Sequence, residues 1–146
     1  RQLQPWFENI SKRQVKSPKI FFRDSGIFHF FLMLKDRHAL LGHPKLGASW
    51  EGFMIEQVIL HVKPSEAYFW ATHSGAEMDL FFIVNGKRYG VEFKWTDAPR
   101  LSRSMVEAGR TLSLEKTWVV YPGSTSYDLA DNVTATPAGR LDLIQC

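Results

Sequence analysis

Cysteine is almost absent from this sequence, and its scarcity limits the kinds of site that the chain can build. The 146 residues include one cysteine, Cys146, which rules out an internal disulfide and a zinc site made of several cysteines. The five histidines show no spacing typical of zinc ligands. A chain with so little cysteine suits a reducing compartment, and we therefore expect a cytoplasmic protein.

Long hydrophobic runs and nucleotide-binding motifs are missing as well. The apolar stretch at residues 27–34 contains His29 and is far too short to cross a bilayer, and no signal-peptide pattern opens the sequence. We expect no membrane contact. The pattern GxxxxGK[ST] does not occur, so the chain cannot by itself be a P-loop ATPase. A net charge of +3 is compatible with a nucleic-acid partner but only weakly favours one.

The sequence does contain enough apolar material for a packed domain. Hydrophobic residues make up 45% of the chain, which argues against general disorder. Residues 1–18 are basic and polar, and the chain starts at Arg1 and enters structure abruptly. We expect residues 1–18 to connect to an upstream region and residues 19–146 to form one domain.

Hydrophobic periodicity and turn signals predict alternating helices and strands. We expect a β-prone segment at 19–23, helices at 27–35, 36–41, 45–63 and 105–112, strands at 66–73, 77–84, 87–95 and 116–121, and late edge elements at 127–135 and 140–144. The helix at 27–35 is apolar nearly all round, which predicts burial against the sheet or against a partner. The strand–helix–strand crossover implies that the strands before and after the helix at 105–112 pair in parallel, and thus a mixed α/β sheet.

A tight hairpin at Asn85-Gly86 is the most informative local feature. Both residues suit a type I′ turn, which places Val84 opposite Lys87 and fixes the register of the two strands. Asp79 then lies opposite Glu92, and Glu77 opposite Lys94, with all four side chains on one face. The other face would carry Met78, Leu80, Val91, Phe93 and Trp95.

Facing carboxylates destabilise a strand pair, so this register indicates a cation between Asp79 and Glu92. Surface salt bridges on a solvated face are the alternative interpretation. Glu51 lies in the long helix and is the further carboxylate that we prefer for the site. Glu56, five residues later, falls on a different helix face, so we interpret it as a supporting or surface residue.

Glu51, Asp79 and Glu92-Phe93-Lys94 resemble the PD-(D/E)XK nuclease-like superfamily, although Met78 stands where that motif name has proline. Residues 15–130 more closely resemble a C-terminal domain of unknown function in a prokaryotic AAA-type ATPase family. The shared motifs are Pro18-Lys19-Ile20, Arg23-Asp24-Ser25-Gly26, Trp50-Glu51-Gly52-Phe53 with Glu56, Tyr68-Phe69-Trp70, Ala76-Glu77-Met78-Asp79, Val91-Glu92-Phe93-Lys94 and Trp118-Val119-Val120-Tyr121-Pro122-Gly123.

The resemblance implies a restriction-endonuclease-like core, with a three-strand meander, a helix and a return strand flanked by helices. It implies Mg²⁺ or Mn²⁺ held by Asp79, Glu92 and the Phe93 carbonyl, with Glu51 completing the shell. Lys94 would orient a water or stabilise charge, so the implied catalytic residues are Glu51, Asp79, Glu92 and Lys94.

The same resemblance implies DNA as substrate and a missing upstream ATPase or winged-helix region of the same chain. That region would bind ATP and mediate any oligomerisation. Two alternatives remain open. One is a catalytically inactive module with the nuclease fold, used for DNA binding or for docking a partner of the ATPase. The other is a structural or oligomerising domain.

Overall fold

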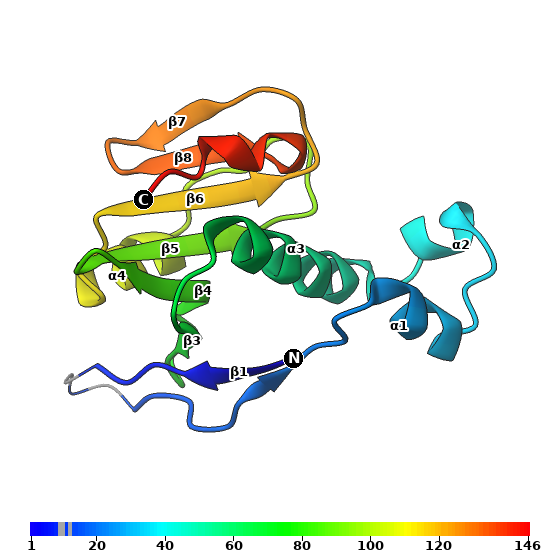
Figure 1. Ribbon diagram of the computed structural model, residues 1–146, viewed down its shortest axis with the longest axis horizontal. Coiled ribbons are helices and arrows are strands. Elements are labelled where there is room, and N and C mark those ends of the chain that lie inside the picture. Colours follow the sequence, from blue (N-terminus) through cyan, green and yellow to red (C-terminus); the bar gives the residue numbers. More distant parts are fainter. Residues whose placement is uncertain (9–10, 12) are drawn as a thin grey trace.

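One mixed sheet organises the part of the chain that the structure describes. The structure is a computed structural model that describes residues 1–8, 11 and 13–146, so Lys12 of the expected connector lies outside the described residues. The strands are β1 (Gln2–Pro5), β2 (Lys19–Ile20), β3 (Ala67–Ala71), β4 (Glu77–Val84), β5 (Lys87–Phe93), β6 (Lys116–Tyr121), β7 (Tyr127–Ala130) and β8 (Val133–Pro137). Within those described residues they form an eight-stranded sheet in the order β2-β1-β3-β4-β5-β6-β8-β7 (Figure 1).

The centre of the sheet has the predicted connectivity. Strands β3, β4 and β5 form an antiparallel meander, and helix α4 (Arg103–Thr111) leads from β5 to β6, which pairs parallel with β5. The β4–β5 turn has positive φ at both Asn85 and Gly86, and Val84 pairs with Lys87. These observations confirm the hairpin register next to the turn and the mixed α/β sheet.

Helices α3 (Leu46–Val62) and α4 cover opposite faces of this central sheet. Met54 and Val58 of α3 pack against Val91, whereas Ala108 of α4 packs against Phe81. Figure 1 shows α3 in front of β5 and α4 behind it. Because side chains alternate along a strand, the two faces of β4 contribute to different cores.

Local signals explain where these helices begin and end. The side chain of Ser102 accepts a hydrogen bond from Met105 N, and this N-cap starts α4. Helix α3 starts at Leu46, so Ser49 belongs to its first turn rather than to its cap. It ends at Val62, and the C-cap residue Lys63 has left-handed backbone angles and is followed by Pro64.

The start of the chain, where we expected a connector to an upstream region, contributes a strand to the sheet. Strand β1 pairs antiparallel with β2 and parallel with β3, and Leu3 is only 2% exposed. The segment Gln-Leu-Gln-Pro alternates polar and apolar residues, but four residues are too few to reveal a strand by periodicity.

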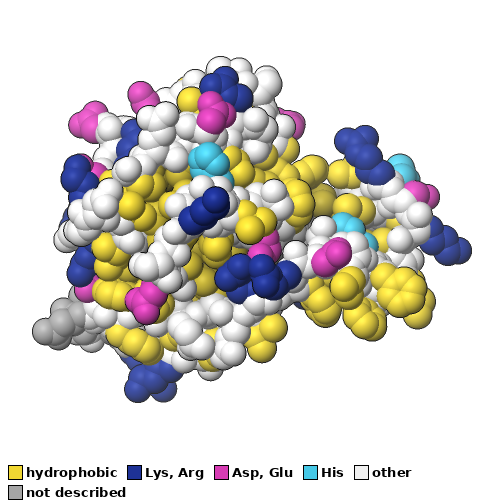
Figure 2. Space-filling model, in the orientation of Figure 1, with side chains coloured by type: hydrophobic (Ala, Val, Ile, Leu, Met, Phe, Trp, Pro, Cys, Tyr) yellow, Lys and Arg dark blue, Asp and Glu magenta, His cyan; other side chains and the backbone are white. Residues whose placement is uncertain are grey.

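Helix α1 (Ser25–Phe31) was expected to be buried against the sheet or against a partner, and the structure does not bury it against the sheet. Asp24 caps it, but α1 and α2 (Arg37–Leu41) project from the sheet beyond the start of α3 (Figure 1). Phe30 is 78% exposed and Met33 is 84% exposed. Figure 2 shows hydrophobic side chains gathered over this projection. The inner side of α1 contacts the described chain, through Phe28 with Phe22 and His29 with Ser49, while most of its apolar surface stays exposed.

The late elements match the expectation in part, since β7 lies at the edge of the sheet. Strand β8 is not at an edge, because it pairs parallel with β6 and antiparallel with β7. Residues 140–144 were expected to form an edge element and instead belong mainly to a 3₁₀ helix, Ala138–Leu143. No helix in the described ranges combines the length and the apolar character that a bilayer span needs.

We predict that Leu3→Ala lowers the free energy of unfolding by about 2–5 kcal/mol, because it removes a buried side chain from the core beneath β1. Gln4→Ala in the same strand, whose side chain is exposed, should change it by less than about 0.5 kcal/mol. Urea unfolding followed by circular dichroism measures both. Equal, small effects of the two substitutions would mean that β1 contributes nothing to the folded domain.

Candidate functional site

Asp79 and Glu92 lie where the regular pairing of the β4–β5 hairpin ends. The last pair of the ladder is Leu80 with Val91. Beyond it, Oδ2 of Asp79 accepts a hydrogen bond from the backbone N–H of Phe93 at 3.0 Å. Asp79 is 7% exposed and Glu92 is 3% exposed. The sequence thus brings these two acids together, in a place almost closed to water.

A β-bulge in β4 changes the alternation that we predicted. Tyr68 pairs with Phe81 but Trp70 pairs with Met78, so β4 contains one more residue than β3 over this stretch. Met78 therefore packs with Trp70 and Phe81 on the α4 face, and its predicted place beside Leu80 was wrong. Bulges of this kind turn side chains to new directions at the end of a ladder.

The pairing of Glu77 also differs from the prediction. Glu77 forms an ion pair with Lys19, not with Lys94. Lys94 instead contacts Glu92, with Nζ 3.0 Å from Oε2. Trp95, placed with the apolar face, is partly exposed and contacts the ring of Trp50 edge-on.

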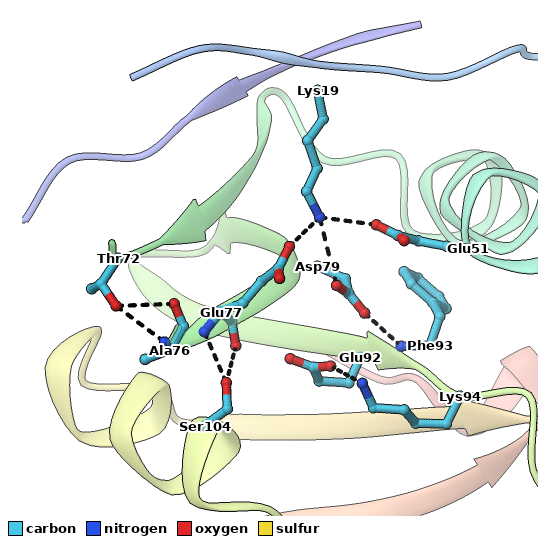
Figure 3. A network of polar contacts seen from close by, with 10 residues as sticks. All are labelled: Lys19, Glu51, Thr72, Ala76, Glu77, Asp79, Glu92, Phe93, Lys94 and Ser104. Carbon is cyan, nitrogen blue, oxygen red and sulfur yellow. Dashed lines mark hydrogen bonds and ion pairs between the residues drawn. The ribbon is translucent and has the colours of Figure 1, made fainter. Parts of the chain in front are cut away.

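Lys19 is the member of this charged cluster that sequence reasoning missed. It comes from β2, and its Nζ lies 3.0 Å from Oε1 of Glu51 and 3.8 Å from Oδ1 of Asp79. Figure 3 shows this side chain reaching from the edge of the sheet towards the carboxylates of Glu51, Glu77 and Asp79. Lys19 stood in one of the family motifs, but β2 and β4 are far apart in sequence, and no local pattern reveals their proximity.

Glu51 joins the cluster from α3, as predicted. It shares Lys19 with Asp79 and sits close enough to Asp79 for the two charges to interact. Glu56 does not join it. Its carboxylate is buried and forms ion pairs with Arg1 and Arg23, which link the start of the chain to α3.

The charges in the cluster are unbalanced. Burial and the nearby charge of Asp79 raise the pKa of Glu92 to about 8, although Lys94 opposes the shift. Burial and Asp79 also raise the pKa of Glu51, against the effect of Lys19. Four carboxylates (Glu51, Glu77, Asp79 and Glu92) face two ammonium groups, those of Lys19 and Lys94. With every group ionised, two negative charges remain without a partner.

The donor atoms suit a hard divalent cation, since Mg²⁺ and Mn²⁺ prefer carboxylate and carbonyl oxygens. Among the described residues, however, no three Asp, Glu, His or Cys side chains form a group that could hold a metal ion as they stand. The ammonium group of Lys19 lies among three of the carboxylates. The donor atoms of the site therefore fit a divalent cation, but in this structure the ammonium group of Lys19 supplies the positive charge among them.

Comparison with known proteins places the chain in a family. Residues 46–141 match a family model described as a domain of unknown function, DUF4143. The chain belongs to the DUF4143 family. Residues 1–38 match a second model, also described as a domain of unknown function, DUF8612. The carboxylates and Lys94 fall in the DUF4143 match, whereas Lys19 falls in the other.

Two curated relatives of this DUF4143 chain are uncharacterized proteins, Mb2031c of Mycobacterium bovis and Rv2008c of Mycobacterium tuberculosis. Each is 48% identical over 141 residues, which cover 97% of this chain and 32% of the relative. The chain thus spans about a third of the length of these relatives. No solved structure matches it.

We predict that Glu92→Gln changes how the stability of this domain depends on pH. The pKa of Glu92 is about 8 in the folded chain against its ordinary value of 4.5, so the folded state keeps a proton that the unfolded state loses. This favourable contribution is complete below about pH 4.5 and disappears as the pH rises through 8. Between pH 5 and 8 the stability of the variant relative to wild type should rise by about 1–4 kcal/mol.

Urea unfolding in the presence of a chelator, at several pH values, gives this difference. Glu115→Gln is the matched control, because Glu115 is exposed and forms an ion pair with Lys87 at the surface. Its difference from wild type should stay flat over the same range. A flat difference for Glu92→Gln as well would mean that Glu92 ionises normally in the folded chain.

Proposed function

We propose that this domain is a metal-dependent phosphodiesterase of the DNA-nuclease type, built on a restriction-endonuclease-like core. The observation that carries the proposal is the buried pair Asp79 and Glu92, with Lys94 in contact with Glu92 and with Glu51 approaching from α3. An acid pair with a lysine two residues after the second acid is the arrangement that the superfamily resemblance implies.

The order of elements supports the same proposal. The long helix α3 precedes the β3–β4–β5 meander, and α4 then leads to β6, which is parallel to β5. This is the sequence of elements expected for a restriction-endonuclease-like core. The two acids sit on its second and third meander strands, and Glu51 sits on the helix that precedes them.

Asp79, Glu92, Glu51 and the carbonyl of Phe93 would hold Mg²⁺ or Mn²⁺, and the bound ion would polarise a phosphoryl group and lower the pKa of a water. The chain's own groups have separate tasks. The N–H of Phe93 fixes one oxygen of Asp79 and leaves the other facing the cluster. Lys94, held at Glu92 and partly exposed, would orient the attacking water or stabilise negative charge on the phosphoryl oxygens.

One observation favours a second candidate function, a catalytically inactive nuclease-fold module for DNA binding or partner docking. The ammonium group of Lys19 already supplies a positive charge to Glu51, Glu77 and Asp79. If that lysine never leaves, no metal enters among these three carboxylates. The remaining functions would then rest on the fold and on its surfaces.

The longer relatives bear on the rest of the proposal. Because the chain covers a third of their length, we propose that it is the C-terminal domain of a longer cytoplasmic protein. An upstream AAA-type ATPase region would bind ATP, would deliver or remodel DNA for this domain, and would carry any oligomeric contacts.

We predict Mn²⁺-dependent nicking of DNA by the full-length protein and Mn²⁺ binding by this chain. Asp79→Asn keeps an acceptor for the Phe93 N–H but removes a charge, and it should weaken Mn²⁺ binding about tenfold or more. Lys94→Met should leave Mn²⁺ bound but lower the nicking rate roughly 100-fold or more. Calorimetry and a plasmid-nicking assay measure the two effects.

Glu115→Gln serves again as the control carboxylate, and both of its properties should match wild type. Nicking that survives Asp79→Asn would assign the activity to another site or to a contaminant. An absence of both Mn²⁺ binding and nicking, together with DNA binding that falls steeply with salt, would favour the inactive module.

A further inference from the structure

We propose that Lys19 is a resident counter-cation that a divalent metal ion must displace, and that its displacement frees strand β2 from the site. This inference rests on the proposed metal site, and it adds a residue from outside the DUF4143 match. It accounts for an arrangement in which the acids are present but no ready group of metal ligands exists among the described residues.

The contacts of Lys19 give the first step of the argument. One ammonium group meets Glu51, Glu77 and Asp79, which come from α3 and from β4. A metal ion held by Glu51 and Asp79 would compete for the same oxygens. The two cations would also repel each other at close range, by an amount that the low exposure of the site increases. Metal and lysine therefore exclude each other.

The weakness of β2 gives the second step. It consists of two residues at the edge of the sheet and pairs with β1, through Gln2 with Ile20 and Leu3 with Lys19. The side chain of Ile20 is exposed, and the nearest apolar anchor is the next residue, Phe21, which packs against the main core. Within β2 itself, Lys19 supplies the contacts with the rest of the domain, through its ion pairs and the ring of Phe69 beneath the ammonium group.

Strand β1 has stronger attachments and should stay. Leu3 is buried in the main core, and β1 pairs parallel with β3 and continues to Trp6, whose N–H donates to the Phe69 carbonyl. Opening is thus confined to the pairing of β2 with β1, because the side chain of Phe21 is held in the main core.

Calorimetry with Mn²⁺ alone tests the competition. Lys19→Met should lower the Kd for Mn²⁺ about tenfold or more, because it removes the competing charge while keeping a long side chain. Lys19→Arg keeps the charge and should bind Mn²⁺ within about threefold of wild type. Lys87→Met removes an equal charge from an exposed pair with Glu115 and should also match wild type.

Hydrogen exchange on the unmodified chain tests the release of β2 without any substitution. Adding Mn²⁺ should speed exchange at the N–H of Phe21, which donates to the Arg1 carbonyl across the β1–β2 pair. Exchange at the N–H of Trp6, which belongs to the β1 side, should not become faster. Circular dichroism on each Lys19 variant confirms that it folds before its Kd is compared.

The outcomes separate this inference from the proposed function. Equal Mn²⁺ affinity in wild type and Lys19→Met, with unchanged exchange at Phe21, would overturn the role of Lys19 and leave the metal site standing. Binding by Lys19→Met but not by wild type would support it strongly. Failure of both to bind Mn²⁺ would overturn the metal site and this inference together.

Discussion

Negative charge buried at the open end of the β4–β5 hairpin is the constraint on which the rest of this structure depends. Asp79 and Glu92 are nearly inaccessible to water, and Glu51 and Glu77 lie close by. Carboxylates taken out of water are costly unless cations or protons neutralise them. The fold meets this cost in three ways: Lys94 beside Glu92, Lys19 among the other three acids, and a raised pKa that lets Glu92 keep a proton.

The sheet explains how residues so distant in sequence reach one place. The turn at Asn85 and Gly86 fixes the register of β4 and β5, and this register brings Asp79 and Glu92 to the same end of the hairpin. Helix α3 packs on the face formed by Leu80 and Val91, which sets Glu51 near that end. Strand β1 lies between β2 and β3, and its pairing with β2 brings Lys19 of β2 within reach.

The sequence predicted most of the site because its main parts are local. A two-residue turn, an alternating hairpin and a helix ended by Pro64 are all short-range signals, and they located Glu51, Asp79, Glu92 and Lys94. The remainder is non-local. The bulge that turns Met78 to the α4 face depends on the pairing of β4 with β3, and the partner of Glu77 depends on a strand about sixty residues away. The expected burial of α1 against the sheet is not seen, for a related reason. An apolar pattern indicates that a surface can be covered but does not identify what covers it.

The two family matches divide the chain into two segments, but ion pairs join residues of one segment to residues of the other. The stretch matched as DUF4143 holds four acids and Lys94, and taken alone it has a larger excess of negative charge in its site. The stretch matched separately supplies Lys19 and also Arg1, which neutralises Glu56 on α3. Glu56 on α3 and Asp79 on β4 are both buried, and each therefore obtains a cation from the first twenty residues. The charge balance of these acids therefore depends on both matched segments. The residues before α1 contribute cations to the acids as well as strands to the sheet.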